Sequence, residues 1–242
     1  MKISTLGTSS GNPEPGRCFS AVSVETGDNV ILFDCGEGIS WRLKEIKAEI
    51  NLIDAIVISH FHPDHVTGIY MLLQMFCLNG RKKDLIVFLP EQSERFEKTL
   101  PLFYLFKETF PFKSVFENVE NISSFYPFIE IFKNSHLSGY KQRVKDAGES
   151  NLLNSYSFSV RENDKIFYYT SDIKNFEGID FSDKNLVIAD AFHPDGEELY
   201  ELIKQNPGKF ILTHGISSKL DGLIKKEKLK AEFADDKKIY LI

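Results

Sequence analysis

The sequence predicts an α/β protein in which helices cover two β-sheets. Short apolar runs alternate with helical patterns along both halves of the chain, an alternation typical of sheets with helices packed on them. Clusters of His and Asp follow several of these runs directly, at the points where strands would end. The 242 residues show no internal repeat or linker, so we expect one domain over residues 1–242.

The N-terminal part of the chain predicts three strands before the first helix. Residues 2–6 form a first strand, and residues 7–16 form a loop rich in Gly, Ser, Asn and Pro. Residues 21–25 alternate apolar and polar side chains, as a half-buried strand does, and residues 30–34 form another strand. A glycine-rich turn then leads into a helix that ends near residue 47.

The rest of the chain continues this alternation. Residues 53–58 and 85–89 are apolar runs of strand length, and residues 68–76 have a helical apolar pattern. A helix is expected near residues 91–100. Further strands are expected near residues 128–134, 155–160, 165–171, 185–190 and 209–213, with helices near residues 196–205 and 219–229.

Residues 100–116 are densely aromatic and differ from the rest of the chain. We favour a helix that packs into the core. The alternative is an exposed apolar surface that serves as a lid or a dimer interface.

Composition narrows the class of protein. The net charge of 29 − 35 = −6 argues against a protein that grips a long nucleic acid through a basic face. Cys18, Cys35 and Cys77 are odd in number and widely spaced, which favours reduced thiols in a cytoplasmic protein. No apolar run approaches the roughly 20 residues needed to cross a membrane.

The hexapeptide His-Phe-His-Pro-Asp-His at residues 60–65 is the strongest chemical signal. It places three imidazoles and a carboxylate directly after the apolar run at residues 53–58. His60 and His62 are two residues apart, so they point the same way on an extended backbone. Asp64 and His65 serve a second ion only if the chain turns, and Pro63 suits that turn. Nitrogen and oxygen ligands packed this closely predict a transition-metal site.

Other polar residues also follow predicted strands. His136, Asp172 and His214 each stand just beyond one. If these strand ends converge, their side chains face the same cleft as the hexapeptide.

In this order, the residues resemble the metallo-β-lactamase fold family of hydrolases. The N-terminal pattern further resembles the ribonuclease Z branch and its phosphodiesterase relatives. The segments that carry this second resemblance are LGTSSGNP at residues 6–13, Arg17 and ILFDCGEG at residues 31–38. The resemblance implies a four-layer αββα sandwich.

The resemblance also implies a site with two divalent metal ions. One ion would bind His60, His62 and His136, the second would bind Asp64, His65 and His214, and Asp172 would bridge them. Zinc fits such nitrogen-rich ligands, and manganese or iron also fits a His/Asp site. Two ions about 3.5–4 Å apart share a hydroxide and clamp a phosphoryl oxygen.

Three residues have further expected roles. Asp64 is expected to orient or deprotonate the attacking water, as in the family. Asp34 is expected to hydrogen-bond a ligand imidazole, with a turn-capping Asp as the alternative. His193 either donates a proton to the leaving oxygen or caps its loop, and the sequence does not separate these roles.

The expected function is that of a phosphodiesterase on a small or cyclic phosphodiester. A ribonuclease Z-like endonuclease acting on tRNA or other RNA is the first alternative. The 36 residues from His136 to Asp172 hold no Gly/Pro-rich arm for tRNA, which speaks against it. A metal-binding sensor or carrier without turnover is the second alternative. The branch commonly forms homodimers.

Overall fold

The computed structural model describes residues 1–215 and 218–242 of the chain. The residues group into two compact units. The first unit comprises residues 1–125 and 235–241, and the second comprises residues 126–234 and 242. The expected single domain over residues 1–242 stays a prediction.

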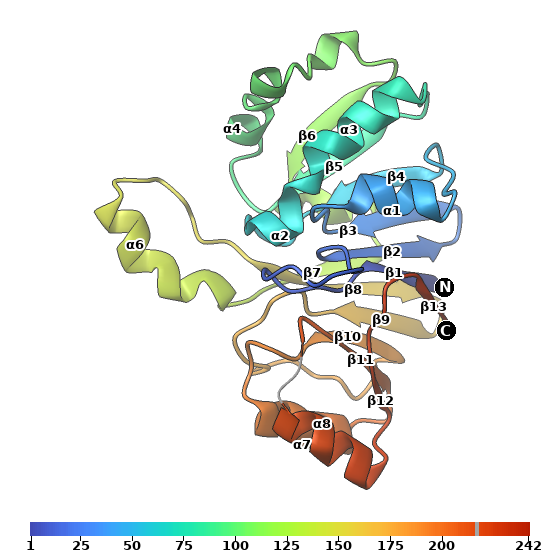
Figure 1. The fold of residues 1–242 in the computed structure, drawn as a ribbon, viewed down its shortest axis with the longest axis vertical. Helices are drawn as coiled ribbons and strands as arrows, with labels where there is room; N and C mark the ends of the chain where they lie inside the picture. Colours follow the sequence, from blue (N-terminus) through green and yellow to red (C-terminus); the bar gives the residue numbers. More distant parts are fainter. Residues whose placement is uncertain (216–217) are drawn as a thin grey trace. The chain divides into compact units, whose positions relative to one another are not determined.

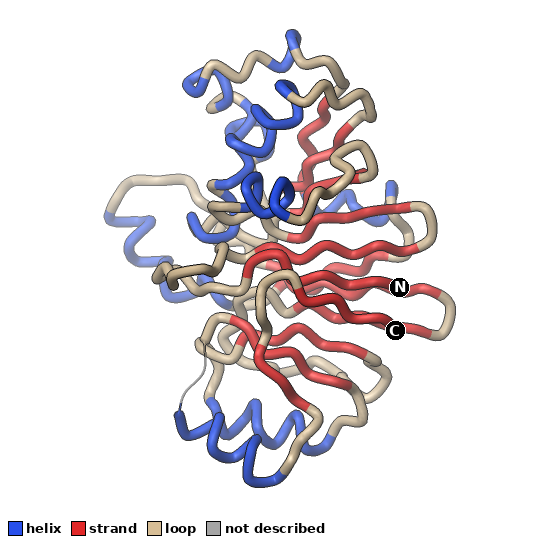
Figure 2. The backbone as a smooth tube through the Cα atoms, turned by 45° about the vertical axis from the view of Figure 1, so that its right-hand side comes forward, coloured by secondary structure: helices blue, strands red, loops and turns tan. Residues whose placement is uncertain are grey.

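The first unit contains a seven-stranded sheet (Figure 1). In hydrogen-bonded order its strands are β13 Lys238–Leu241, β1 Lys2–Gly7, β2 Ala21–Thr26, β3 Asn29–Phe33, β4 Ile53–Val57, β5 Leu85–Leu89 and β6 Ser114–Asn118. The pairs from β13 to β3 are antiparallel, and those from β3 to β6 are parallel. The two ends of the chain meet here, because β13 pairs with β1 (Figure 2). The carboxyl ends of the parallel strands therefore share one edge of the sheet.

Helices cover one face of this first sheet. The helices of the unit are α1 Ile39–Glu45, α2 Pro63–Val66, α3 Gly68–Leu78, α4 Ser93–Glu97 and α5 Ile122–Phe125. Leu43 of α1 and Leu72 and Phe76 of α3 share a buried cluster with Ile56 and Val87 of the sheet. Burying such side chains stabilises the fold by about 1.5–3 kcal/mol each. This packing fixes α3, which follows the hexapeptide in the chain, against the sheet.

The second unit contains a six-stranded sheet (Figure 1). In hydrogen-bonded order its strands are β12 Ala231–Phe233, β11 Lys209–Thr213, β10 Leu186–Asp190, β9 Lys165–Tyr169, β8 Tyr156–Glu162 and β7 Ile129–Lys133. The strands from β9 to β12 are parallel, and β8 is antiparallel to both of its neighbours. The parallel strands again end at one edge.

Two helices, α7 Gly196–Gln205 and α8 Ser218–Glu227, cover one face of the second sheet. Leu199 and Ile203 of α7 pack in one cluster with Val187 and Phe210 of the strands. Asp195 caps α7, because its side chain accepts hydrogen bonds from the N–H groups of the first turn. A shorter helix, α6 Lys141–Asp146, lies on the connection from β7 to β8.

The expected helix over residues 100–116 is wrong. The segment forms the 3₁₀ turns η1 Leu100–Phe103 and η2 Lys107–Thr109 and then enters β6. Pro101 and Pro111 explain the break, since proline interrupts helical hydrogen bonding. Its side chains divide between two environments. Leu100, Leu105, Phe112 and Phe116 are buried in the core, whereas Leu102, Phe103, Tyr104 and Phe106 are exposed.

Within the part of the chain that the structure describes, no helix combines the length and apolar character needed to span a membrane.

Candidate metal centre

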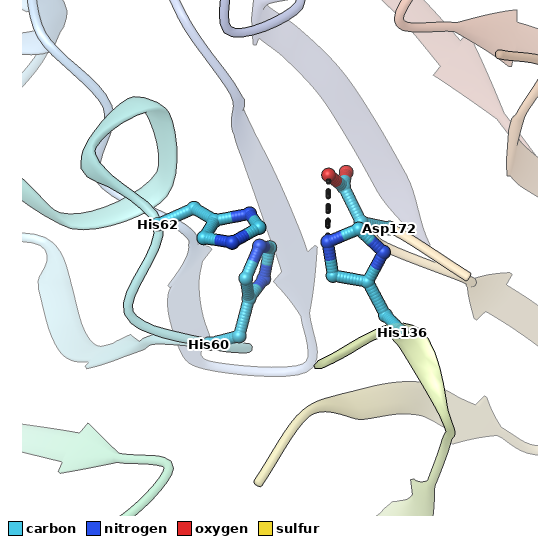
Figure 3. Close-up of side chains that lie close together, drawn as sticks. All are labelled: His60, His62, His136 and Asp172. Carbon is cyan, nitrogen blue, oxygen red and sulfur yellow. Dashed lines mark ion pairs between the residues drawn. The ribbon is translucent and has the colours of Figure 1, made fainter. Parts of the chain in front are cut away.

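The first two histidines of the hexapeptide lie side by side after β4. His62 has an extended backbone, with φ −67° and ψ 144°. The ring centroids of His60 and His62 are 4.6 Å apart and the rings are steeply inclined to each other (Figure 3). The expectation that both imidazoles point the same way is confirmed.

Pro63 then starts the short helix α2, which turns the chain as expected. The turn brings the ring of His65 to 4.2 Å from that of His60, centroid to centroid. Asp64 lies beside it, with its Oδ2 3.6 Å from His65 Nε2. Three imidazoles and one carboxylate are thus gathered within the first unit.

Asp34 supports this cluster from the end of β3. Its Oδ2 lies 2.8 Å from Nδ1 of His65, and its Oδ1 accepts the backbone N–H of Ser59 at 2.8 Å. The Ser59 hydroxyl donates to Oδ2 at 3.0 Å. The expected hydrogen bond between Asp34 and an imidazole of the hexapeptide is confirmed.

Two glycines allow the backbone to close around the hexapeptide. A Cβ at Gly36 would lie 2.3 Å from the carbonyl oxygen of Asp64, and a Cβ at Gly68 would lie 2.1 Å from the carbonyl oxygen of Gly36. The N–H of Cys35 donates to the carbonyl of His65 at 2.7 Å. Only glycine permits this approach, which holds the Asp64–His65 turn against the end of β3.

Cys35 stands beside these residues and is completely buried. Burial raises the pKa of its thiol well above the ordinary value, and the negative charge of Asp34 raises it further. The thiol is therefore held in its neutral form. The hexapeptide itself offers nitrogen and oxygen ligands. All three cysteines are free of disulfide bonds, as expected.

The second unit gathers a matching set around Asp172. His214 Nε2 lies 2.9 Å from Asp172 Oδ1, and His136 Nε2 lies 3.6 Å from Asp172 Oδ2. Figure 3 draws the pairing of His136 with Asp172. His136 follows β7, Asp172 follows β9 and His214 follows β11, as the sequence predicted. One carboxylate therefore lies between two imidazoles.

Asn134 ties the two loops of this set together. Its side-chain amide donates to the carbonyl oxygen of Asp172 at 3.2 Å and to Ser157 Oγ at 3.1 Å. Its Oδ1 accepts the backbone N–H of His136 at 3.1 Å and the hydroxyl of Ser155 at 2.5 Å. All four hydrogen-bonding positions of the amide are used, so Asn134 fixes His136 relative to Asp172.

His193 lies near the same carboxylate and is held by Asp190, the last residue of β10. Its Nδ1 is 2.8 Å from Asp190 Oδ2 and 3.7 Å from Asp172 Oδ2. Asp190 Oδ1 accepts the N–H groups of Phe192 and His193, and Oδ2 accepts that of Ile173. Asp190 was not expected from the sequence as a residue of the site. The usable signal was its position at a strand end, three residues before His193.

The side chains of each unit fit divalent metals. Imidazole and carboxylate suit zinc, manganese and iron alike. Asp172, Asp190 and His193 also place one ligand atom each within 4.8 Å of the others. Since both oxygens of Asp190 are occupied by N–H donors, we assign it to holding His193 and not to binding metal.

Comparison with known proteins agrees with the fold. The ribonuclease Z of Picrophilus torridus is 36% identical over 150 residues, which cover 60% of this chain and 48% of that enzyme. The chain thus spans about half the length of this curated relative.

Two solved structures cover nearly the whole chain. The metallo-β-lactamase fold protein YhfI of Bacillus subtilis gives a TM-score of 0.71 at 18% identity, covering 99% of this chain and 98% of its own. The short form of human tRNase Z gives a TM-score of 0.69 at 20% identity, covering 100% of this chain and 99% of its own. The predicted fold class and the resemblance to the metallo-β-lactamase superfamily and its ribonuclease Z-like branch are confirmed.

A family model also matches most of the chain. The model described as "Anti-Pycsar protein Apyc1" matches residues 1–214, which include the hexapeptide and every His and Asp described above. The chain belongs to the anti-Pycsar protein Apyc1 family.

Proposed function

We propose that this chain is a metal-dependent phosphodiesterase that hydrolyses a small or cyclic phosphodiester at a site with two divalent ions. One observation carries the proposal. In each unit, His and Asp side chains gather at strand ends, and a buried carboxylate orients an imidazole: Asp34 orients His65, and Asp190 orients His193. Such support is typical of functional metal sites and is uncommon for scattered surface histidines.

The residues that would hold the ions are those that the resemblance implies. His60, His62 and His136 would hold one ion, Asp64, His65 and His214 the other, and Asp172 both. When bound, such a pair supplies Lewis-acid stabilisation of the phosphoryl oxygens and lowers the pKa of water to about 7. Zinc is the proposed metal, with manganese or iron as substitutes.

Two residues would move protons. Asp64 would orient the attacking water through its carboxylate, which lies in the first turn of α2 beside His65. His193 would donate a proton to the leaving oxygen. Because the carboxylate of Asp190 accepts from Nδ1, the Nε2 of His193 is the nitrogen that can face the substrate.

Two observations favour a small diester over structured RNA. The net charge is −6, whereas gripping many phosphates needs an excess of basic residues. The connection from β7 to β8 forms only the turn η4 His136–Tyr140 and the short helix α6. RNA cleavage remains the second candidate, because the curated relatives are named ribonuclease Z.

The test compares zinc- and manganese-loaded protein on three substrates: bis(p-nitrophenyl) phosphate, a cyclic nucleotide and a precursor tRNA. We expect turnover of the two small diesters and an intact tRNA. Asp172→Ala should lose both bound metal and turnover. Asp164→Asn, a change at an acid whose side chain is 83% exposed, should lose neither.

Three results would contradict the proposal. Site-specific cleavage of the tRNA alone would make the chain an endoribonuclease. Tight metal binding without turnover of any substrate would make it a metal sensor or carrier. Full activity of Asp172→Ala would remove Asp172 from the site.

A further inference from the structure

We infer that Ser59 is a positioning residue that links Asp34 to His60, so that one buried carboxylate orients two metal-binding imidazoles at once. The inference rests on the metal site of the proposed function. All of its residues belong to the first unit. His65 is held by Asp34 directly, and His60 is held through the hydroxyl of Ser59.

The contacts form one continuous chain of hydrogen bonds. Asp34 Oδ2 lies 2.8 Å from His65 Nδ1 and 3.0 Å from Ser59 Oγ, and Ser59 Oγ lies 3.0 Å from His60 Nδ1. All four side chains are completely buried. Water therefore does not replace any link in this chain without a rearrangement of the core.

The number of available protons sets the direction of each bond. A carboxylate only accepts hydrogen bonds, and a serine hydroxyl has a single proton. The Ser59 proton points to Asp34 Oδ2, so the contact with His60 must be donated by the imidazole. His60 is therefore the Nδ1–H tautomer, and its Nε2 carries the lone pair. The bond from His65 Nδ1 to Asp34 gives His65 the same tautomer.

Both imidazoles thus present the nitrogen that a metal needs, but by different routes. In the proposed site, His60 belongs to the ion shared with His62, and His65 belongs to the other ion. Removal of the Ser59 hydroxyl takes the orienting hydrogen bond from His60 alone. Loss of the Asp34 carboxylate disrupts the orienting hydrogen bonds of both His60 and His65. The structure therefore predicts that a change at Ser59 lowers the affinity for one ion only, whereas a change at Asp34 lowers the affinity for both.

The first experiment measures the tautomer directly in the full chain. Long-range ¹H–¹⁵N correlation of ¹⁵N-histidine-labelled protein, at mildly alkaline pH and without added metal, distinguishes Nδ1–H from Nε2–H imidazole. A His60→Asn variant assigns the His60 signals. We expect the Nδ1–H form for His60 and a shift toward a tautomer mixture in Ser59→Ala. An Nε2–H form in the unsubstituted protein would overturn the inference.

The second experiment titrates zinc against a competing chelator and resolves the two affinities. We expect Ser59→Ala to weaken the binding of one zinc ion by about 10–100-fold and to leave the affinity for the other unchanged. A loss of this size is usual when a group that supports a metal ligand is removed. Asp34→Asn should weaken the binding of both zinc ions. Ser59→Thr keeps the hydroxyl and should restore the affinity.

Ser114→Ala is the matched control. Ser114 is a buried serine of the same unit whose Oγ has no hydrogen-bond partner among the described residues. Its loss should change neither affinity. Equal weakening of both ions by Ser59→Ala, or an effect no larger than that of Ser114→Ala, would refute the positioning role. If the unsubstituted chain binds no zinc, the proposed function fails, and the tautomer measurement still decides the role of Ser59.

Discussion

Replacement of His193 by Ala should slow hydrolysis in a way that depends on the leaving group. A positioned general acid contributes about 10²–10⁴-fold when the leaving oxygen needs a proton. That range corresponds to about 2.7–5.4 kcal/mol of transition-state stabilisation. A cyclic nucleotide releases a sugar alkoxide, which needs the proton. The p-nitrophenolate ion is stable without one.

The structure also sets the expected effect of Asp190. Its bond to His193 Nδ1 is 2.8 Å long and its side chain is completely buried. A hydrogen bond to a charged group contributes about 1.5–3 kcal/mol, equivalent to roughly tenfold to a hundredfold in rate. Asp190→Asn should therefore cost less than His193→Ala, because the imidazole remains but loses its preferred tautomer.

The assay measures kcat for both substrates with the unsubstituted protein, His193→Ala and Asp190→Asn, each with its zinc content determined. We expect large losses with the cyclic nucleotide and small losses with bis(p-nitrophenyl) phosphate, at unchanged zinc content. Equal losses on both substrates would show that His193 does not donate the proton. Loss of zinc in His193→Ala would show that it binds metal instead.

Two further predictions concern stability. Gly36→Ala should lower the free energy of unfolding by about 1–3 kcal/mol and weaken zinc binding, because the new Cβ would lie 2.3 Å from the Asp64 carbonyl oxygen. Urea unfolding and zinc titration measure these two effects. In the control variant Gly139→Ala, the new Cβ has no neighbouring atom within 4 Å, so stability and zinc binding should both stay unchanged. Arg81→Lys should lower the free energy of unfolding by about 1–3 kcal/mol, measured by urea unfolding, since the buried guanidinium donates to the carbonyls of Ile50, Ile53 and Asp84. The control variant Arg161→Lys changes a side chain that is 52% exposed, so its free energy of unfolding should change little. Equal effects of the two substitutions would contradict this account.

The strands that sequence reasoning located well are those whose signal is local. β5 Leu85–Leu89 matches the expected range, and β4 Ile53–Val57 differs by one residue. Both are apolar runs buried within a parallel sheet, so their composition alone identifies them. The strand β13 was missed because it pairs with β1 from the opposite end of the chain. No pattern within its four residues reveals that partner.

The same distinction separates the site residues. The hexapeptide and the residues at strand ends could be predicted because imidazole is rare and its spacing is informative. Asp190 and Ser59 were not singled out, since Asp and Ser are common and act here through a neighbour. Their roles follow from side-chain contacts, which only the three-dimensional structure provides.

The backbone takes a left-handed conformation at three residues that lie at or just after strand ends. Asp34, Ser171 and His214 have φ values of 58°, 50° and 65°, in the left-handed region that glycine adopts at least cost. Asp tolerates this conformation, but each of the others costs about 1–3 kcal/mol. Glycine at 34 or 214 would remove a carboxylate or an imidazole from the site. Asp34 and His214 thus keep a left-handed backbone at positions where the proposed site uses their side chains, although positive φ also occurs at residues outside the site, such as Lys47 and Gln92.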